Sequence, residues 1–131
     1  MACDLTIMTT LSLKNLTCRF GDVVAVDGID LDVGDRELVS LLGPSGCGKT
    51  TTLRCIAGFE SPDSGDILFD QVSVAGLPPE KRNLGMVFQN YALFPHMTVS
   101  GNLAYGLQMR KTPQQEIDRR IGETLEIVQL A

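Results

Sequence analysis

The strongest constraint on this chain is a glycine-rich loop with the sequence Gly43-Pro44-Ser45-Gly46-Cys47-Gly48-Lys49-Thr50. It fills every fixed position of the pattern G-x-x-x-x-G-K-[ST]. Its three glycines allow successive backbone N–H groups to turn inward around an oxyanion. Lys49 supplies a mobile positive charge for the outer phosphates, and the hydroxyl of Thr50 is a hard oxygen ligand for magnesium. The segment from Gly43 to Thr51 therefore predicts a site for the phosphates of a nucleotide with its Mg²⁺.

The residues on either side of the loop have the pattern that such a site requires. Residues 38–42, Leu-Val-Ser-Leu-Leu, form an apolar run that is typical of a strand buried on both faces of a parallel sheet. After the loop, Leu53, Ile56 and Ala57 recur at helical spacing, and Gly58 stands where a C-terminal cap belongs. The order strand, glycine-rich loop, helix predicts an α/β fold and argues against a plain glycine-rich turn.

Other segments predict an antiparallel part. Residues 11–20 and 23–33 alternate apolar and polar side chains around a Gly-Asp break, which indicates an antiparallel pair of strands. Residues 67–69 and 84–88 are predicted to be further short strands.

Beyond Phe88 the pattern becomes helical. Thr112 as the cap, Pro113 at the first helical position and a Gln three residues after the cap predict the start of a helix. This helix is expected to run to the end of the chain with one apolar face, formed by Ile117, Ile121, Leu125 and Val128.

Composition limits the remaining classes of function. The net charge of -5 argues against a nucleic-acid surface, which needs clustered Lys and Arg. No apolar run is long enough to span a bilayer and the first ten residues lack the start of a signal peptide, so we expect a cytosolic chain. The cysteines lack C-x-x-C spacing and are predicted to be reduced thiols, of which Cys47 is expected to be a reactive thiolate: Cys3, Cys18, Cys47 and Cys55.

A second motif gives the chain a family resemblance. The loop, which reads GPSGCGKTT, is followed by Gly85-Met86-Val87-Phe88-Gln89-Asn90-Tyr91-Ala92-Leu93-Phe94-Pro95-His96. From Leu11 to Ala131 the chain resembles the ATP-binding subunits of bacterial ABC importers, most of all the group that serves sugars, polyamines or ferric iron. The resemblance implies an α/β P-loop nucleoside-triphosphatase core with an N-terminal antiparallel β subdomain, about 11–88. The Q-loop and the start of a helical subdomain would follow, about 89–131.

The resemblance also implies roles for single residues. Phe20 would stack on the adenine, although a core aromatic at a strand end fits the spacing equally well. Gln89 would be the Q-loop glutamine, reaching magnesium or the attacking water; taken alone, it would be a surface residue. Lys49 and Gln89 are thus the predicted catalytic residues, and Thr50 and Gln89 the predicted magnesium ligands.

The family's partners follow from the same resemblance. Asn90 to Leu107 looks like the surface for the coupling helix of a membrane-spanning subunit, through exposed aromatics and Met. Leu103 and Leu107 are instead expected in the core of the helical subdomain. A second ATP-binding subunit would form a dimer with ATP, and a solute-binding protein would take part indirectly. The chain would lie at the cytoplasmic face of the cell membrane.

Two departures from the family pattern matter. Gly101 stands three residues after Thr98 in place of an acid, so the helix start should be weaker by about 1 kcal/mol. The signature motif, the Asp-Glu strand and the switch histidine belong downstream of Ala131. The apolar runs that close on Asp27 and Asp70 are interpreted as hairpin ends. We therefore expect ATP binding without significant hydrolysis by this chain alone, and a non-hydrolysing module is the alternative; a P-loop kinase or GTPase fits less well.

Overall fold

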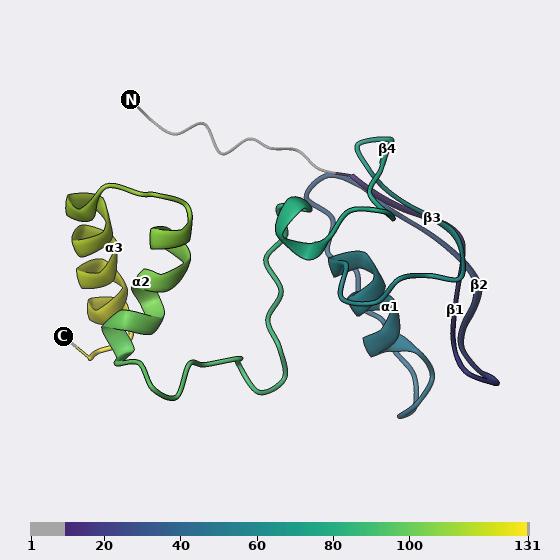
Figure 1. Cartoon of the computed structure of the whole chain (residues 1–131), viewed down its shortest axis with the longest axis horizontal. Helices are drawn as coiled ribbons and strands as arrows, with labels where there is room; N and C mark the ends of the chain where they lie inside the picture. The colour runs from purple at the N-terminus through teal and green to yellow at the C-terminus, as the bar shows by residue number, and fades with distance from the viewer. Residues whose placement is uncertain (1–9, 131) are drawn as a thin grey trace. The chain divides into compact units, whose positions relative to one another are not determined.

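The computed structural model describes residues 10–130, which divide into two compact units, the first ending at Met86 and the second beginning at Val87 (Figure 1). The first unit contains β1 (Leu11–Phe20), β2 (Val23–Val33), α1 (Lys49–Ala57), β3 (Ser64–Phe69), β4 (Val72–Ser73) and a 3-10 turn at Pro79–Lys81. The second unit contains α2 (Val99–Met109) and α3 (Gln114–Ile127).

The four strands form one antiparallel sheet in the order β2-β1-β3-β4. The predicted antiparallel pair at 11–20 and 23–33 is confirmed, with Leu11 opposite Val33 and Phe20 opposite Val23. The interpretation of the two aspartates is half right. Asp70 lies in the turn between β3 and β4 and accepts a hydrogen bond from the Thr10 N–H at 2.8 Å, whereas Asp27 lies inside β2, away from the hairpin end.

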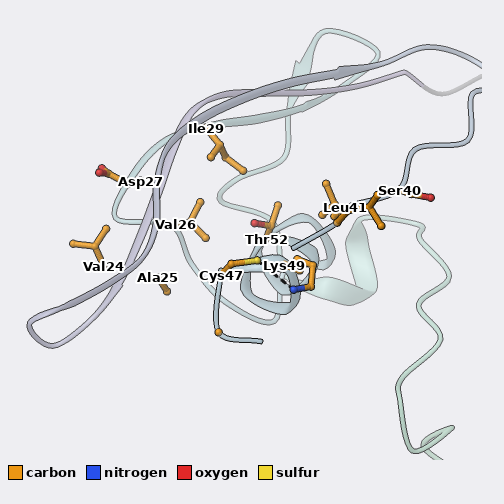
Figure 2. A pocket seen from close by; sticks show the side chains of 12 residues that line it. Val24, Ala25, Val26, Asp27, Ile29, Ser40, Leu41, Cys47, Lys49 and Thr52 are labelled. Carbon is orange, nitrogen blue, oxygen red and sulfur yellow. Dashed lines mark hydrogen bonds between the residues drawn. The ribbon is translucent and has the colours of Figure 1, made fainter. Parts of the chain in front are cut away.

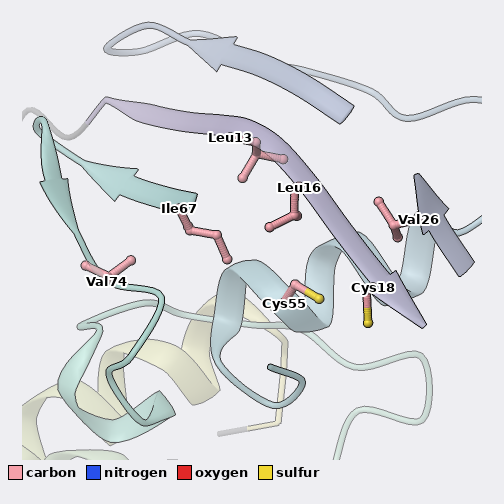
Figure 3. Close-up of a cluster of buried hydrophobic side chains, with 7 residues drawn as sticks. All are labelled: Leu13, Leu16, Cys18, Val26, Cys55, Ile67 and Val74. Carbon is pink, nitrogen blue, oxygen red and sulfur yellow. The ribbon is translucent and has the colours of Figure 1, made fainter. Parts of the chain in front are cut away.

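The core of the first unit lies between the sheet and α1 (Figure 3). Buried side chains of the three longer strands meet Cys55 of α1 and Val74 there: Leu13, Leu16, Cys18, Val26 and Ile67. The helix ends as predicted at Gly58, whose left-handed φ of 85° lets its N–H reach the carbonyls of Arg54 and Cys55. Burial, together with the neighbouring Cys18 thiol, raises the pKa of Cys55 to about 12. The core therefore fixes α1, and with it the glycine-rich loop, against the sheet.

Two strand predictions are wrong. Residues 38–42 form no strand, and Leu38 and Leu42 are 93% and 91% exposed. Residues 84–88 also form no strand. A strand that is buried on both faces needs hydrogen-bonded neighbours and covering layers. Among residues 10–130 no strand pairs with either segment, so apolar composition alone does not produce the ladder.

In the second unit α2 and α3 pack together, with Ala104 and Ile117 buried. The helix α2 begins after Thr98, whose hydroxyl oxygen accepts a hydrogen bond from the Gly101 N–H at 3.1 Å. A capping box has two hydrogen bonds, and this one is formed. The predicted loss of stability concerns the other bond, from the Thr98 N–H to the acidic side chain that Gly101 lacks.

The predicted start and end of α3 both need correction. Pro113, and not Thr112, is the capping residue, because the Pro113 carbonyl already accepts from the N–H groups of Glu116 and Ile117. The helix ends at Ile127 and does not continue along the chain. Gln129 adopts a left-handed φ of 58°, and the Leu130 N–H turns back to the Leu125 carbonyl. Ile117, Ile121 and Leu125 are at least half-buried as predicted, but Val128 beyond this stop is exposed.

Candidate phosphate-binding site

The glycine-rich loop meets the sheet at Gly48. This residue has a left-handed φ of 88°, and a Cβ atom added to it would lie 2.2 Å from the carbonyl oxygen of Ala25 in β2. No side chain fits at that distance, so glycine is required for both reasons. The contact sets the start of α1 directly against β2.

The N-terminal end of α1 opens into a small cavity. The first helical hydrogen bond joins the Thr52 N–H to the Gly48 carbonyl at 2.8 Å, so the N–H groups of the preceding turn have no acceptor within the helix. No acidic residue lies in that first turn. The cavity measures about 220 Å³ and is lined by Ala25, Ser45, Gly46, Gly48, Lys49, Thr50 and Thr51. Free N–H groups, the positive helix end and a cation together favour an anion here.

Lys49 is the cation of this cavity. Its ammonium group donates to the carbonyl oxygens of Gly43 and Pro44 at 2.7 and 2.6 Å, and to the sulfur of Cys47 at 3.2 Å. Within the described part of the chain no carboxylate forms an ion pair with it. Neutral acceptors therefore hold the charge, and the oxygens of a phosphate can replace them at a net gain in attraction.

A larger cavity of about 540 Å³ adjoins the loop (Figure 2). Side chains of β2 form one side and residues 40–42 another, as Figure 2 shows. The lining residues include Val24, Val26, Ile29, Leu41, Cys47, Lys49 and Thr52. The lining is mainly apolar, with Asp27, Ser40, Lys49 and Thr52 as its polar members, and the loop lies at its edge.

Three predicted residues of the first unit line neither cavity: Phe20, and Gly43 and Pro44 of the loop, whose carbonyl oxygens accept from Lys49. Phe20 lies at the end of β1 and is 48% exposed. Gln89 belongs to the second unit, where it is exposed in a turn. The roles of Phe20 toward the base and of Gln89 toward the metal stay predictions.

Two residues that sequence reasoning missed also shape the site. Thr52 is buried, and its hydroxyl donates to the Gly48 carbonyl at 3.0 Å, which fixes the first turn of α1. The run of three threonines at 50–52 was the available signal, since a Thr four residues after a carbonyl can bond back to it. Ala25 contributes only its backbone, for which the sequence carries no signal.

The donor set fits a triphosphate with its magnesium. Gly48 has no side chain to block a phosphate, and the N–H groups at the start of α1 and the Lys49 ammonium group can bind its oxygens. The Thr50 hydroxyl beside them is an oxygen ligand of the kind that Mg²⁺ prefers.

Known proteins are similar to this chain in both sequence and fold. The profile of the ABC transporter family matches residues 26–131. The spermidine/putrescine import ATP-binding protein PotA of Marinobacter nauticus is 56% identical over 122 residues, which cover 93% of this chain and 33% of that protein. PotA of Nitrosospira multiformis is 55% identical, over 94% of this chain and 34% of its own length. The chain thus spans about a third of the length of these relatives.

Solved structures agree with this comparison. A dimeric ATP-binding cassette in a post-hydrolysis state, bound to ADP and Pi, superposes with a TM-score of 0.79 and 28% identity. The match covers 92% of this chain and 58% of that one. A bacterial Atm1-family ABC exporter with ATP bound gives a TM-score of 0.69 at 30% identity, over 76% of this chain and 18% of the exporter.

Proposed function

The chain belongs to the ABC transporter family of ATP-binding proteins, and on this premise we propose that it binds Mg-ATP and that the complete family domain hydrolyses it to drive solute import. The observation that carries the proposal is the geometry of the loop and helix: Gly48 set against Ala25, and Lys49 at the open N-terminal end of α1.

Each residue of the proposed site has a distinct task. The N–H groups of the first turn and Lys49 hold the phosphates, Thr50 and Gln89 hold the metal, and Phe20 packs on the adenine. Bound Mg²⁺ would neutralise phosphate charge and orient the triphosphate. Gln89 would also orient the attacking water, since hydrolysis in such sites is mostly positioning and charge stabilisation. A module that binds ATP without hydrolysis is the alternative for these 131 residues.

The second unit offers the proposed contact with the membrane-spanning subunit. An apolar cavity of about 330 Å³ is lined by Leu93, Phe94, Pro95, Met97, Val99, Asn102 and Leu103. Tyr91 beside it in sequence is 75% exposed, and the ring of Phe94 packs on Tyr105 with centroids 4.5 Å apart. We propose that residues 91–97 receive an apolar helix of that subunit, while the half-buried Leu103 and Leu107 belong to the core of the unit.

The proposed assembly places the chain at the cytoplasmic face of the membrane, as a dimer with a second ATP-binding subunit and with a solute-binding protein acting indirectly. No helix among residues 10–130 has the length and apolarity needed to cross a bilayer. Because the named relatives are spermidine/putrescine import ATP-binding proteins, a polyamine is the proposed solute.

The proposal that the chain binds Mg-ATP is tested by measuring nucleotide binding to the purified protein. Lys49→Ala should weaken binding of a fluorescent ATP analogue roughly thirtyfold, the value of a lost charge-assisted hydrogen bond. The melting temperature should fall only slightly, because Lys49 is partly exposed and its ammonium group contacts loop carbonyls and the Cys47 sulfur, not the core. Lys14→Ala, which removes an exposed lysine of β1, is the matched control and should bind as wild type does. Equal affinity of wild type and Lys49→Ala would contradict the site.

The metal and the base are tested separately. Thr50→Ala should reduce the magnesium dependence of binding while it leaves magnesium-free binding nearly unchanged. Phe20→Ala should weaken ATP and ADP binding alike, whereas an effect confined to thermal stability would make Phe20 an ordinary packing residue. Preference for GTP over ATP would favour the GTPase alternative.

A further inference from the structure

Arg82 is a buried cation whose hydrogen bonds, among the described residues, all go to backbone carbonyls. Arg82 is 5% exposed. Its guanidinium group donates hydrogen bonds to four carbonyl oxygens. Nε reaches Leu77 at 2.8 Å and one terminal nitrogen reaches Ala75 at 3.0 Å. The other terminal nitrogen reaches Cys55 at 2.7 Å and Ile56 at 2.9 Å. One side chain thus joins the last turn of α1 to the segment that follows β4.

Carbonyl dipoles, and not a carboxylate, stabilise this charge. No described Asp or Glu forms an ion pair with Arg82. Burial lowers the pKa of Arg82. The carbonyls of the last helical turn have no helical donors and form the negative end of α1. The five N–H groups of a guanidinium suit several acceptors at once, which an ammonium does not match.

Gly58 makes room for this arrangement. A Cβ atom there would lie 2.7 Å from Nε and 3.0 Å from Cζ of Arg82. Gly58 is thus needed for its left-handed φ at the end of α1 and also leaves the space that the guanidinium occupies.

We propose that Arg82 is a positioning residue of the nucleotide site: by holding the C-terminal end of α1, it sets the direction in which the N-terminal end presents its N–H groups and Lys49 to phosphate. The inference rests on the proposed function. A nine-residue helix is about 14 Å long and rigid, so displacement of one end tilts the other. Gly48 anchors the first end on β2, and Arg82 holds the carbonyls of the last turn in addition to the packing of Cys55 in the core.

Arg82→Lys and Arg82→Gln in the purified protein test the proposal. Lys keeps the charge but cannot reach all four carbonyls, and Gln loses the charge. Both should raise the dissociation constant for Mg-ATP, about tenfold for Arg82→Lys, because misplacement of a binding group by about 1 Å is costly. Ile117→Ala, a core substitution in α3 of the second unit, is the control for stability alone: it should lower the melting temperature without changing the dissociation constant measured below that temperature.

A second variant covers the case in which the Arg82 variants do not fold. Gly58→Ala retains the arginine but pushes the guanidinium from its place, and it should weaken Mg-ATP binding in the same direction. Folded Arg82 or Gly58 variants that bind Mg-ATP as tightly as wild type would overturn the inference. Wild-type protein that fails to bind Mg-ATP would instead overturn the proposed function, so the two failures are distinguishable.

Discussion

The ammonium nitrogen of Lys49 lies 3.2 Å from the sulfur of Cys47, and both side chains belong to the glycine-rich loop. Cys47 is exposed, whereas Cys18 and Cys55 are buried in the core. A thiol reagent has to reach the sulfur atom, which is accessible at Cys47 and covered at Cys18 and Cys55. The position of Cys47 thus makes its sulfur a reporter for the site.

We expect N-ethylmaleimide to modify Cys47 before Cys18 and Cys55, and to prevent ATP binding by filling the loop. Prior addition of Mg-ATP should slow the labelling of Cys47 selectively, because the nucleotide covers the loop and engages Lys49. Peptide mass mapping that follows each of the four cysteines separately measures this, with the buried Cys18 and Cys55 as the internal control. Labelling of Cys47 at one rate with and without Mg-ATP would count against the phosphate site.

Gly48→Ala should destabilise the protein more than Gly46→Ala does. Both glycines have left-handed φ values, 88° and 84°, which cost an alanine about 1 kcal/mol. A Cβ atom at Gly46 meets nothing within 4 Å, while one at Gly48 lies 2.2 Å from the Ala25 carbonyl. The free energy of unfolding should therefore fall by about 1 kcal/mol for Gly46→Ala and by about 3 kcal/mol for Gly48→Ala, as urea titration measures. Equal losses in the free energy of unfolding for the two variants would mean that the Gly48 backbone does not lie this close to the Ala25 carbonyl of β2.

The parts of the fold that were predictable depend on short-range signals. The alternation in residues 11–33 needs only its own hairpin partner, and both strands have the predicted bounds. The helix after the loop has its stop signal one residue beyond its end, in Gly58. The loop itself was recognisable because its glycines, its Lys and its Thr are all fixed by contact with one kind of ligand.

The predictions that were wrong or incomplete concern residues whose structure depends on partners far away in the sequence. Residues 38–42 and 84–88 have the composition of strands, but strand formation requires a neighbour that composition does not reveal. Arg82 was missed as a structural residue for a related reason: its acceptors are backbone carbonyls as far as 27 positions away. Backbone acceptors leave no mark in a sequence, so only the structure could show the contact.

Asn102→Asp should loosen the segment that is proposed to face the membrane subunit. The Asn102 amide nitrogen donates to the carbonyls of Phe94, Met97 and Thr98 at 3.2, 3.3 and 3.0 Å, and its oxygen accepts from the Phe94 N–H at 2.8 Å. An aspartate keeps the acceptor but loses both N–H donors of the amide, and with them the contacts with all three carbonyls. We expect a loss of about 1–3 kcal/mol in local stability, seen as faster hydrogen exchange of the Phe94 amide.

Asn90→Asp is the matched control, since it makes the same chemical change at an exposed residue in a turn. It should leave the exchange of the Phe94 amide unchanged. Comparable exchange in wild type and Asn102→Asp would show that the Asn102 amide does not hold this segment in place.

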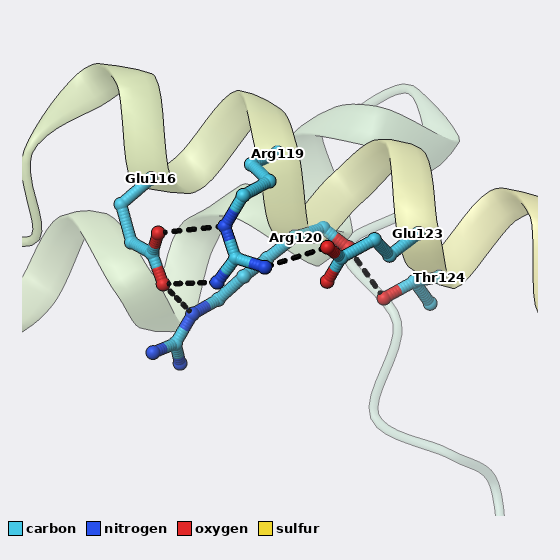
Figure 4. Close-up of polar contacts among 5 residues, drawn as sticks. All are labelled: Glu116, Arg119, Arg120, Glu123 and Thr124. Carbon is cyan, nitrogen blue, oxygen red and sulfur yellow. Dashed lines mark hydrogen bonds and ion pairs between the residues drawn. The ribbon is translucent and has the colours of Figure 1, made fainter. Parts of the chain in front are cut away.

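The last prediction concerns acid and α3. Glu116 lies between two arginines on the exposed side of the helix, and Arg119 also reaches Glu123 (Figure 4). Hydrogen bonds from Arg119, and then from Arg120, lower the pKa of Glu116 to about 2 from an ordinary value of 4.5. Since the pKa in the folded chain is the lower one, the carboxylate favours the folded state above pH 4.5, and this contribution declines as the pH falls through 2.

Glu116→Gln should therefore weaken α3 at neutral pH and remove part of the loss of helical circular dichroism between pH 4.5 and 2. Glu126→Gln is the control, because Glu126 lies on the same helix without an ion pair among the described residues, and it should keep the wild-type acid profile. High salt should shrink the difference between wild type and Glu116→Gln, as it does for exposed charges. Identical acid profiles for wild type and Glu116→Gln at low salt would mean that the arginine contacts do not stabilise the helix, whatever their geometry.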